Sequence, residues 1–291
     1  MKVSHYWYGV AVGVLALFAS AANAETTAAG KTKFSTVKVD PDANKIVGFV
    51  DIRPGYIPTG QFLTENTVRL GYQFKKDRRL VVEQYISTNL YQPTSAASGM
   101  NVTQYDGYVG AQLNNLWTDK ANGLSFSYAP RFYLPQSQLS QDRGLITFHR
   151  SNFALTKQFN GSFSLTLMEI PLLFLYENAG YVKNGTASAN PIFQNRVYLI
   201  ADVNITSKLK FSFPLMFFQT KHSDFQVGAR NNGAWAHSVW IWPELDYSVN
   251  DKVTVGVAYY NMNNLIDADF HPQIGDGLRN GVFQGVFIYS I

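Results

Sequence analysis

The chain lacks cysteine, has few charged residues and has no long apolar run after its N-terminal region. With no cysteine among 291 residues, a disulfide framework, a thiolate metal site and a cysteine nucleophile are excluded. Charged residues make up only 15% of the sequence, below the roughly one quarter that is typical of soluble domains. The longest later apolar run, Ile170 to Tyr176, is too short for a transmembrane helix. A membrane protein built from this sequence must therefore cross with strands.

The charge pattern gives no sign of a nucleic-acid partner. The formal net charge is +4 and the isoelectric point about 9.0, but lysines and arginines are scattered through the chain rather than clustered. Neither a Gly-rich phosphate loop nor a His and carboxylate spacing typical of zinc occurs. We therefore expect no nucleic-acid partner, no cofactor and no metal.

The N-terminus has the three parts of a secretory signal peptide. Lys2 supplies the positive charge, Gly9 to Phe18 the apolar segment, and Ala22 to Ala24 the small residues of a cleavage site. We predict a signal peptide over residues 1–24. Residues 25–43 are small, polar and charged, which is typical of a flexible leader.

The stretch from Phe193 to Phe218 shows the repeating unit of the rest of the chain. Apolar and mostly polar residues alternate along two arms of about ten residues, joined by Ile205 to Lys208. A period of two predicts strands with one apolar face. Ten residues is about the length of a tilted strand that crosses a bilayer. One such strand can face lipid on its apolar side and a wet lumen on its polar side.

Twelve segments repeat this pattern. They lie near residues 46–56, 66–75, 79–91, 103–113, 123–134, 146–159, 162–176, 192–205, 208–219, 236–249, 252–261 and 280–291. Every second connection is short: 75–78, 114–122, 159–162, 205–208 and 248–251. The others are long and polar: 57–65, 92–102, 135–145, 177–191, 220–235 and 262–279. This asymmetry is typical of membrane barrels with short periplasmic turns.

We therefore predict an all-β fold for residues 44–291, a transmembrane antiparallel up-and-down β-barrel of about twelve strands. An even number of strands places both termini on the same, periplasmic side.

This plan resembles that of bacterial outer-membrane β-barrels. The resemblance includes the alternating C-terminal segment Phe287 to Ile291, although that class usually ends in an aromatic residue and this chain ends in isoleucine. It implies a location in the outer membrane of a Gram-negative bacterium. It also implies contacts with outer-membrane lipids, lipopolysaccharide and the barrel assembly machinery.

Strand parity turns most charged side chains of the predicted wall inward, because an arginine facing lipid at the midplane costs about 2–4 kcal/mol. We expect Glu169 among them because the apolar parity switches at Met168 and Glu169, which suggests a β-bulge. The predicted pore-lining residues are Arg53, Arg69, Asp106, Arg131, Arg150, Glu169, Arg196, Asp202, Glu244 and Asp246. Counting along the strands places the arginines at 53, 131, 150 and 196 in the outer half, and Asp202, Glu244 and Asp246 near the periplasm.

The predicted function is a narrow passive channel for small hydrophilic solutes, selected by these opposed charges. The alternative is that the charges only cross-link the inner wall, since barrels of about 8 strands are filled and those of 16–18 hold channels. Trp240 and Trp242 face inward and could stack on a ligand, or could pack at the rim. A further alternative is an adhesin or receptor that acts through its long loops.

A third alternative is enzymatic. His149, Ser151 and Asn152 form a His-x-Ser-Asn string that resembles the string of the outer-membrane phospholipase A family, a twelve-stranded barrel with a Ser nucleophile and a His base. His149 and Ser151 share the lipid-facing parity of Phe153. The string begins an ingoing strand here, whereas in that family it ends an outgoing one. We therefore expect a channel and no enzyme.

Overall fold

A computed structural model describes residues 45–58, 60–91, 101–261, 264–266, 271–275 and 281–291. The predicted signal peptide (1–24), the predicted leader (25–43) and most of the 262–279 connection lie outside the described residues. Within these residues no helix is long and apolar enough to cross a membrane.

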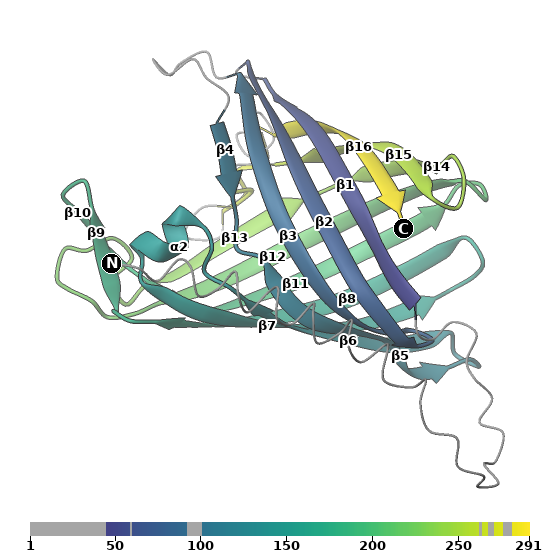
Figure 1. Cartoon of the computed structure of the whole chain (residues 1–291), viewed down its shortest axis with the longest axis horizontal. Coiled ribbons are helices and arrows are strands. Elements are labelled where there is room, and N and C mark those ends of the chain that lie inside the picture. Colours follow the sequence, from purple (N-terminus) through teal and green to yellow (C-terminus); the bar gives the residue numbers. More distant parts are fainter. Residues whose placement is uncertain (1–44, 59, 92–100, 262–263, 267–270, 276–280) are drawn as a thin grey trace, which may run out of the picture.

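One closed sheet makes up nearly all of the described chain (Figure 1). Its strands are β1 (Lys45–Ile57), β2 (Gln61–Lys75), β3 (Arg78–Tyr91), β4 (Asn101–Gln104), β5 (Tyr108–Asp119), β6 (Leu124–Tyr133), β7 (Leu145–Gln158), β8 (Phe163–Tyr176), β11 (Pro191–Asn204), β12 (Leu209–His222), β13 (Trp235–Ile241), β14 (Glu244–Ser248), β15 (Val253–Tyr260) and β16 (Val282–Ser290). β4 and β5 both pair with β3, and β13 and β14 both pair with β12. Each of these two pairs forms one interrupted wall strand, so the barrel has twelve, which confirms the predicted fold.

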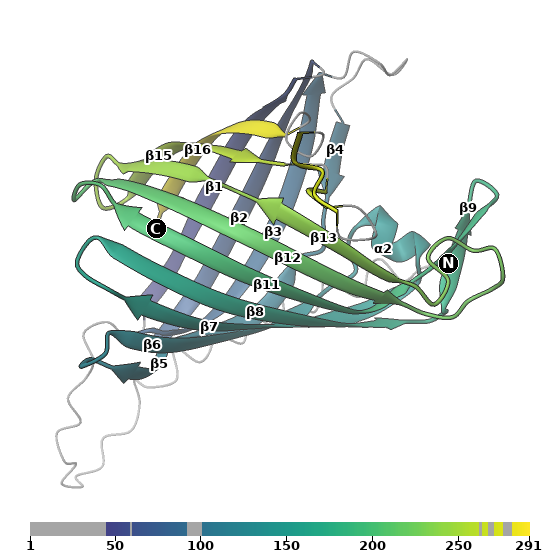
Figure 2. The same ribbon diagram turned by 180° about the vertical axis from the view of Figure 1, so that it is seen from behind.

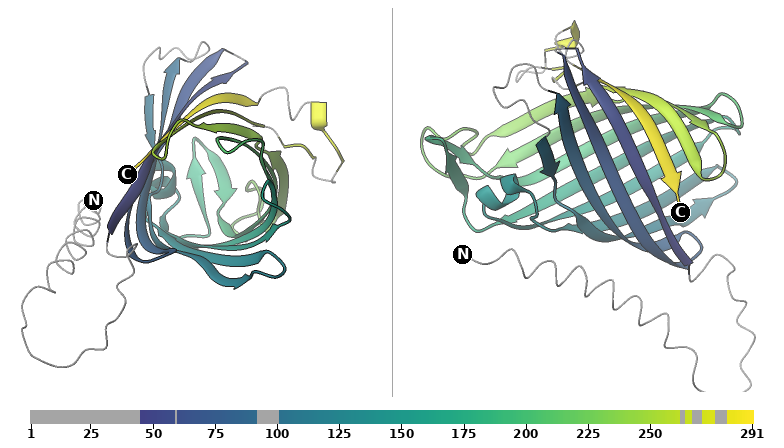
Figure 3. Two further views of the ribbon diagram at one scale, coloured as in Figure 1. Left: turned by 90° about the vertical axis from the view of Figure 1, so that its right-hand side faces the viewer. Right: turned by 45° about the horizontal axis from the view of Figure 1, so that its top comes forward.

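Pairing of β1 with β16 closes the barrel. The two strands are antiparallel from Phe49 opposite Ser290 to Tyr56 opposite Phe283. Viewed from the end, the strands form a ring (Figure 3), and from behind β11, β12 and β13 run side by side (Figure 2). Closure leaves no long sheet edge, which is the condition for a β-structure to lie in hydrocarbon.

The alternation in the sequence sets the two faces of the wall. Val68 and Leu70 are each 40% exposed and Phe132 is 53% exposed, all on the outer face. Side chains of the opposite parity, such as Met216 and Val286, are almost fully buried inside. The outward apolar band is the surface that faces lipid in such a barrel.

The connections differ in length at the two ends of the barrel, as predicted, with one exception. Five turns at one end are short, and the described chain begins at the same end, where Lys45 lies opposite Gln73 beside the β2–β3 turn. The exception is the connection between β1 and β2, for which the predicted long loop over residues 57–65 was wrong. β2 begins at Gln61, so only residues 58–60 connect it to β1.

Two of the longer connections carry structure of their own. The β6–β7 connection holds a short helix, α2 (Gln138–Asp142), which Ser137 caps at its N-terminus. The β8–β11 connection folds into a separate hairpin of β9 (Gly180–Lys183) and β10 (Thr186–Ala189). Both lie at the long-loop end of the barrel (Figure 1).

The interruption between β13 and β14 is sealed by side chains. Pro243, which has no N–H to give to the ladder, follows Trp242 at the break. β15 ends before it reaches β13, so the N–H groups on that edge of β13 donate to asparagine side chains instead. The Ile241 N–H donates to Asn261 Oδ1 at 2.6 Å and the Val239 N–H to Asn264 Oδ1 at 2.7 Å. The wall therefore stays hydrogen-bonded where the strands are short.

The predicted inward position of Glu169 is wrong. The β8–β11 register runs without a shift through Glu169, which lies opposite Val197 on one side and Phe153 on the other. Residues directly opposite each other in a sheet share a face, and Phe153 is exposed on the outer face. The apolar switch in the sequence arises because Ile170 and Leu172 pack inside the barrel, with exposures of 0% and 2%, not because the strand bulges.

The absence of cysteine allows this orientation to be tested by labelling. In protein reconstituted in lipid vesicles, we expect Glu169→Cys to react with a membrane-soluble maleimide and poorly with a charged, water-soluble one. Asp202→Cys, on the inner face, should react readily with the charged reagent, because Asp202 is partly exposed beside Lys210. Equal labelling of both variants by the charged reagent would contradict the outward position of Glu169.

Candidate functional site

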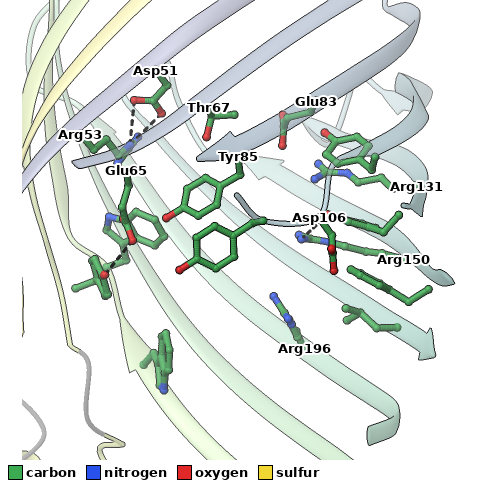
Figure 4. A pocket seen from close by; sticks show the side chains of 18 residues that line it. Asp51, Arg53, Glu65, Thr67, Glu83, Tyr85, Asp106, Arg131, Arg150 and Arg196 are labelled. Carbon is green, nitrogen blue, oxygen red and sulfur yellow. Dashed lines mark hydrogen bonds and ion pairs between the residues drawn. The ribbon is translucent and has the colours of Figure 1, made fainter. Parts of the chain in front are cut away.

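The barrel interior holds a cavity of about 740 Å³ at its middle and long-loop levels. It is lined from both sides of the barrel by charged and aromatic side chains (Figure 4). The lining residues are Asp51, Arg53, Glu65, Thr67, Glu83, Tyr85, Tyr105, Asp106, Tyr108, Arg131, Tyr133, Phe148, Arg150, Leu172, Arg196, Trp240, Trp242 and Tyr260. Of the residues predicted to line a pore, Arg53, Asp106, Arg131, Arg150, Arg196, Trp240 and Trp242 are among them.

Three arginines on β6, β7 and β11 form a row along one side of the cavity (Figure 4). Arg131 and Arg150 lie directly opposite each other on neighbouring strands, and Arg196 lies on β11, the next strand but one. We call Arg131, Arg150 and Arg196 the arginine row. Arginine is always charged at physiological pH, so the row is a fixed positive surface.

The partners of the arginine row are neutral. The Arg131 guanidinium lies over the Tyr108 ring, 4.5 Å from its centroid. Arg150 Nε donates to Asn152 Oδ1 at 2.8 Å, and Arg196 Nε donates to the side-chain oxygen of Gln194 at 2.5 Å. In the part of the chain that the structure describes, no carboxylate forms an ion pair with any of the three. Their charge is therefore not cancelled locally.

The arginines on the other side of the cavity are paired with carboxylates. Arg53 donates to Asp51 at 2.9 Å and to Glu244 at 2.5 Å, and Arg69 forms an ion pair with Glu83. These side chains are only 14–17% exposed, so solvent screens the pairs weakly. This side of the wall is held by ion pairs, as the wall-network alternative expected.

The contact between Arg53 and Glu244 corrects the predicted depths. Sequence counting placed the two in different halves of the barrel. In the structure Glu244 lies opposite Ala258, Ala258 opposite Gln284, and Gln284 opposite Gly55. Each step to a neighbouring strand in a tilted barrel also changes depth, and counting residues from a turn ignores this stagger.

The two remaining predicted acidic residues lie outside the cavity. Asp202 forms an ion pair with Lys210 of β12 at 3.0 Å. Asp246, on β14, lies opposite the same lysine, so both carboxylates are near the short-turn end of the barrel. Glu169, as described above, is on the outer face, where it accepts a hydrogen bond from Asn195 at 3.1 Å. These three do not line the cavity. Arg69 and Glu244 do not line it either, but each forms an ion pair with a lining residue, Glu83 and Arg53 respectively.

Glu65 is a cavity residue that the sequence analysis missed. It accepts hydrogen bonds from Gln284 Nε2 at 2.6 Å and from the Tyr260 hydroxyl at 3.2 Å. Glu65 was assigned to a loop because the alternation fades at the start of β2. Glu65 lies two residues before Thr67, so it shares the inward parity of Thr67, and this parity is what could have identified it.

Aromatic side chains were also underestimated. Of the eighteen residues that line the cavity, eight are aromatic. Tyr85 and Tyr105 lie with ring centroids 4.7 Å apart, and Trp242 and Tyr260 with centroids 5.3 Å apart. Trp240 meets Phe218 edge-on at 5.4 Å. Both predicted tryptophans therefore face the cavity rather than the rim.

A second cavity of about 460 Å³ adjoins the first on the long-loop side and shares Asp106, Phe148 and Arg196 with it. Two more arginines, Arg143 and Arg230, line it. α2 is attached here through Asp106, which accepts hydrogen bonds from the Ser137 N–H at 2.7 Å and from the Ser140 hydroxyl. Arginines thus continue from the mouth of the barrel to the arginine row.

The His-x-Ser-Asn string lies on both faces of β7. His149 Nε2 and Ser151 Oγ are 2.8 Å apart on the outer face, within the range of an activated nucleophile. His149 Nδ1 has no hydrogen-bond partner among the described residues, so nothing there orients the imidazole as the third member of a triad would. Asn152 instead accepts from Arg150 on the inner face. The Ser–His pair of a hydrolase is therefore present, but the third residue of a catalytic triad is missing among the described residues.

No protein-family model and no curated protein matches the sequence. The fold is similar to that of NanC porin, with a TM-score of 0.53 at 12% identity over 82% of this chain and 98% of the porin. It is also similar to an outer membrane channel from Pseudomonas putida F1, with a TM-score of 0.56 at 11% identity over 90% of this chain and all of that one. The chain therefore has the fold of porin-like outer-membrane barrels, as the sequence predicted.

The attachment of α2 to the β9–β10 hairpin should depend on pH. Lys183 donates to Asp142 at 2.7 Å, and hydrogen bonds from Lys183 and Gln138 lower the pKa of the Asp142 carboxyl. A lowered carboxyl pKa means that the contact is stabilising above the ordinary range of about 4 and is lost as the pH falls below the lowered value. We expect the amides of residues 180–189 to be less protected at acidic than at neutral pH, when each exchange rate is divided by the intrinsic rate of an unstructured amide at the same pH.

Asp142→Asn should remove this pH dependence, and its protection factors at neutral pH should resemble those of the acidified protein. The pair is partly exposed, so high salt should have a similar, smaller effect. An Asp142→Asn variant that keeps the full pH dependence would show that another group is responsible.

Proposed function

We propose that the protein is a passive, anion-selective channel in the outer membrane of a Gram-negative bacterium. The fold supports a channel because the two solved structures described above, to which it is similar, are named as a porin and a channel. Twelve strands are enough for a lumen partly filled by side chains, and the cavities along its long-loop half agree with that. The solutes would be small and hydrophilic.

The arginine row is the observation that carries the selectivity. Arg131, Arg150 and Arg196 line the cavity with neutral partners only, whereas Arg53 and Arg69 on the other side form ion pairs with Asp51, Glu244 and Glu83. The formal charges of the whole lining balance, but they are separated in space, and a solute that passes along β6, β7 and β11 meets a positive surface. Positive rings and rows favour anions in pores.

The orientation follows from the same proposal. The short turns and both termini of the chain would face the periplasm, where residues 25–43 would lead from the cleaved signal peptide to β1. The long-loop end, with α2 and the β9–β10 hairpin, would face the outside. Lipopolysaccharide, outer-membrane lipids and the barrel assembly machinery would be the partners of such a protein.

Reversal potentials in planar bilayers test the selectivity. We expect steady ohmic steps that favour chloride over potassium, and a fall in this preference of roughly fivefold in Arg150→Gln/Arg196→Gln. After screening, the two lumenal charges together contribute on the order of 1 kcal/mol to the energy of a passing ion, and this corresponds to about that ratio. Lys157→Gln is the matched control, because Lys157 lies opposite Leu165 on the outer face.

Unchanged selectivity in the double variant would remove the arginine row from the pathway. Absence of any conductance would instead favour the adhesin or receptor alternative. In that case the β9–β10 hairpin and the connections 220–235 and 262–279 would be the candidate binding surfaces.

Phospholipase activity is the second candidate, favoured only by the 2.8 Å contact of His149 with Ser151. Because His149 Nδ1 has no partner among the described residues, we expect purified protein and Ser151→Ala to release fatty acid from phospholipid vesicles at the same background rate. Hydrolysis that is lost in Ser151→Ala, with an unchanged barrel, would make the protein an enzyme.

A further inference from the structure

The cavity combines the arginine row with an unusually aromatic lining. A pore that only passes small inorganic anions needs positive charge and water, and aromatic faces add nothing to either. Here Tyr85, Tyr105, Trp240 and Tyr260 line the same cavity as the arginine row (Figure 4). Apolar rings exposed to a water-filled space typically mark a surface that a ligand covers.

The rings and the arginines lie close to one another. Arg196 lies over the Phe218 ring, 5.3 Å from its centroid, and Phe218 contacts Trp240 edge-on at 5.4 Å. Phe218 thus links Arg196 to Trp240, and both line the cavity, so a solute whose anionic group binds Arg196 can direct its ring toward Trp240. Tyr85, paired with Tyr105, projects into the same space from the opposite wall (Figure 4).

The cavity is lined by four arginines and four carboxylates, so the sign of the ligand depends on which of these groups are already held by neighbours. Glu65 already accepts from Gln284 and Tyr260, and Asp106 accepts from Ser137 and Ser140, so these carboxylates have donors. The arginine row has only neutral partners, and a carboxylate is the acceptor that a guanidinium binds best, with two parallel hydrogen bonds. A volume of about 740 Å³ is within the range of sites for small organic ligands.

We propose that the cavity is a binding site for small aromatic carboxylates, with the carboxylate on the arginine row and the ring against Trp240 and the Tyr85–Tyr105 pair. This inference rests on the proposed function for its biological meaning, since the bound acid would be the solute that the channel carries. The binding itself does not require conduction.

Two probes of equal charge and nearly equal size isolate the contribution of the ring. Benzoate and cyclohexanecarboxylate differ in whether the ring is aromatic and planar. Isothermal titration of the whole protein in detergent should show benzoate binding roughly two- to tenfold more tightly, which is the range for aromatic pairs beyond simple burial. This comparison uses the unmodified protein, so a variant that fails to fold cannot obscure it.

Variants assign the two halves of the site. Trp240→Leu should weaken benzoate and leave cyclohexanecarboxylate nearly unchanged, whereas Arg196→Gln should weaken both. Trp235→Leu is the matched control, because Trp235 lies on the same strand but is 52% exposed and does not line the cavity. Benzylamine, which has the ring and the opposite charge, should not bind.

Equal affinity for the two acids, or no binding of either, would overturn the inference and show that the rings only fill the barrel. If the protein conducts anions but shows no preference for benzoate, this inference fails and the proposed channel stands. If benzoate binds as described and no conductance is seen, the site is supported and the channel is contradicted.

Discussion

Closure of the backbone hydrogen-bond ladder is the constraint on which the structure depends. A strand in hydrocarbon has no water to satisfy its N–H and C=O groups, and each unpaired group costs several kcal/mol. The pairing of β1 with β16 satisfies the two strands that would otherwise be edges. Where the ladder is interrupted at Pro243, the side chains of Asn261 and Asn264 supply the missing acceptors. The two faces of the wall follow from this closure, because every second residue must then point inward.

A closed wall of twelve strands gives its inward residues little room, and the barrel uses its two sides differently. On one side Arg53 and Arg69 form short ion pairs with carboxylates. The pair of Arg53 with Glu244 connects β1 to β14, which are not adjacent, and the pair of Arg69 with Glu83 connects the neighbouring strands β2 and β3. On the other side the arginine row has only neutral partners. The ion-paired side cross-links the wall, and under the proposed function the arginine row is the surface that a solute would meet. Both interpretations of the inward charges, wall network and pore, thus describe different parts of the same interior.

The sequence predicted the fold well because alternation, strand length and connection length all depend on the same closure. The β11–β12 hairpin and the inward positions of Trp240 and Trp242 were predicted from parity alone. Glu169 was misplaced because a change of apolar parity was taken for a bulge, whereas Ile170 and Leu172 are apolar residues that face inward. The contact of Arg53 with Glu244 was also missed, since tilt and stagger are properties of the whole barrel and not of any one strand. Glu65 was missed because the predicted second strand began at residue 66, whereas β2 begins at Gln61.

The most direct test of closure is a cross-link at the seam between the first and last strands. Ile52 and Phe287 lie opposite each other, at a separation typical of residues that a disulfide can join, and the chain has no other cysteine. In Ile52→Cys/Phe287→Cys, mild oxidation of the folded protein in detergent should form an intramolecular disulfide in nearly every molecule, detected by its altered electrophoretic mobility. If only intermolecular disulfides or free thiols are found, the two strands are not paired and the closed barrel is contradicted.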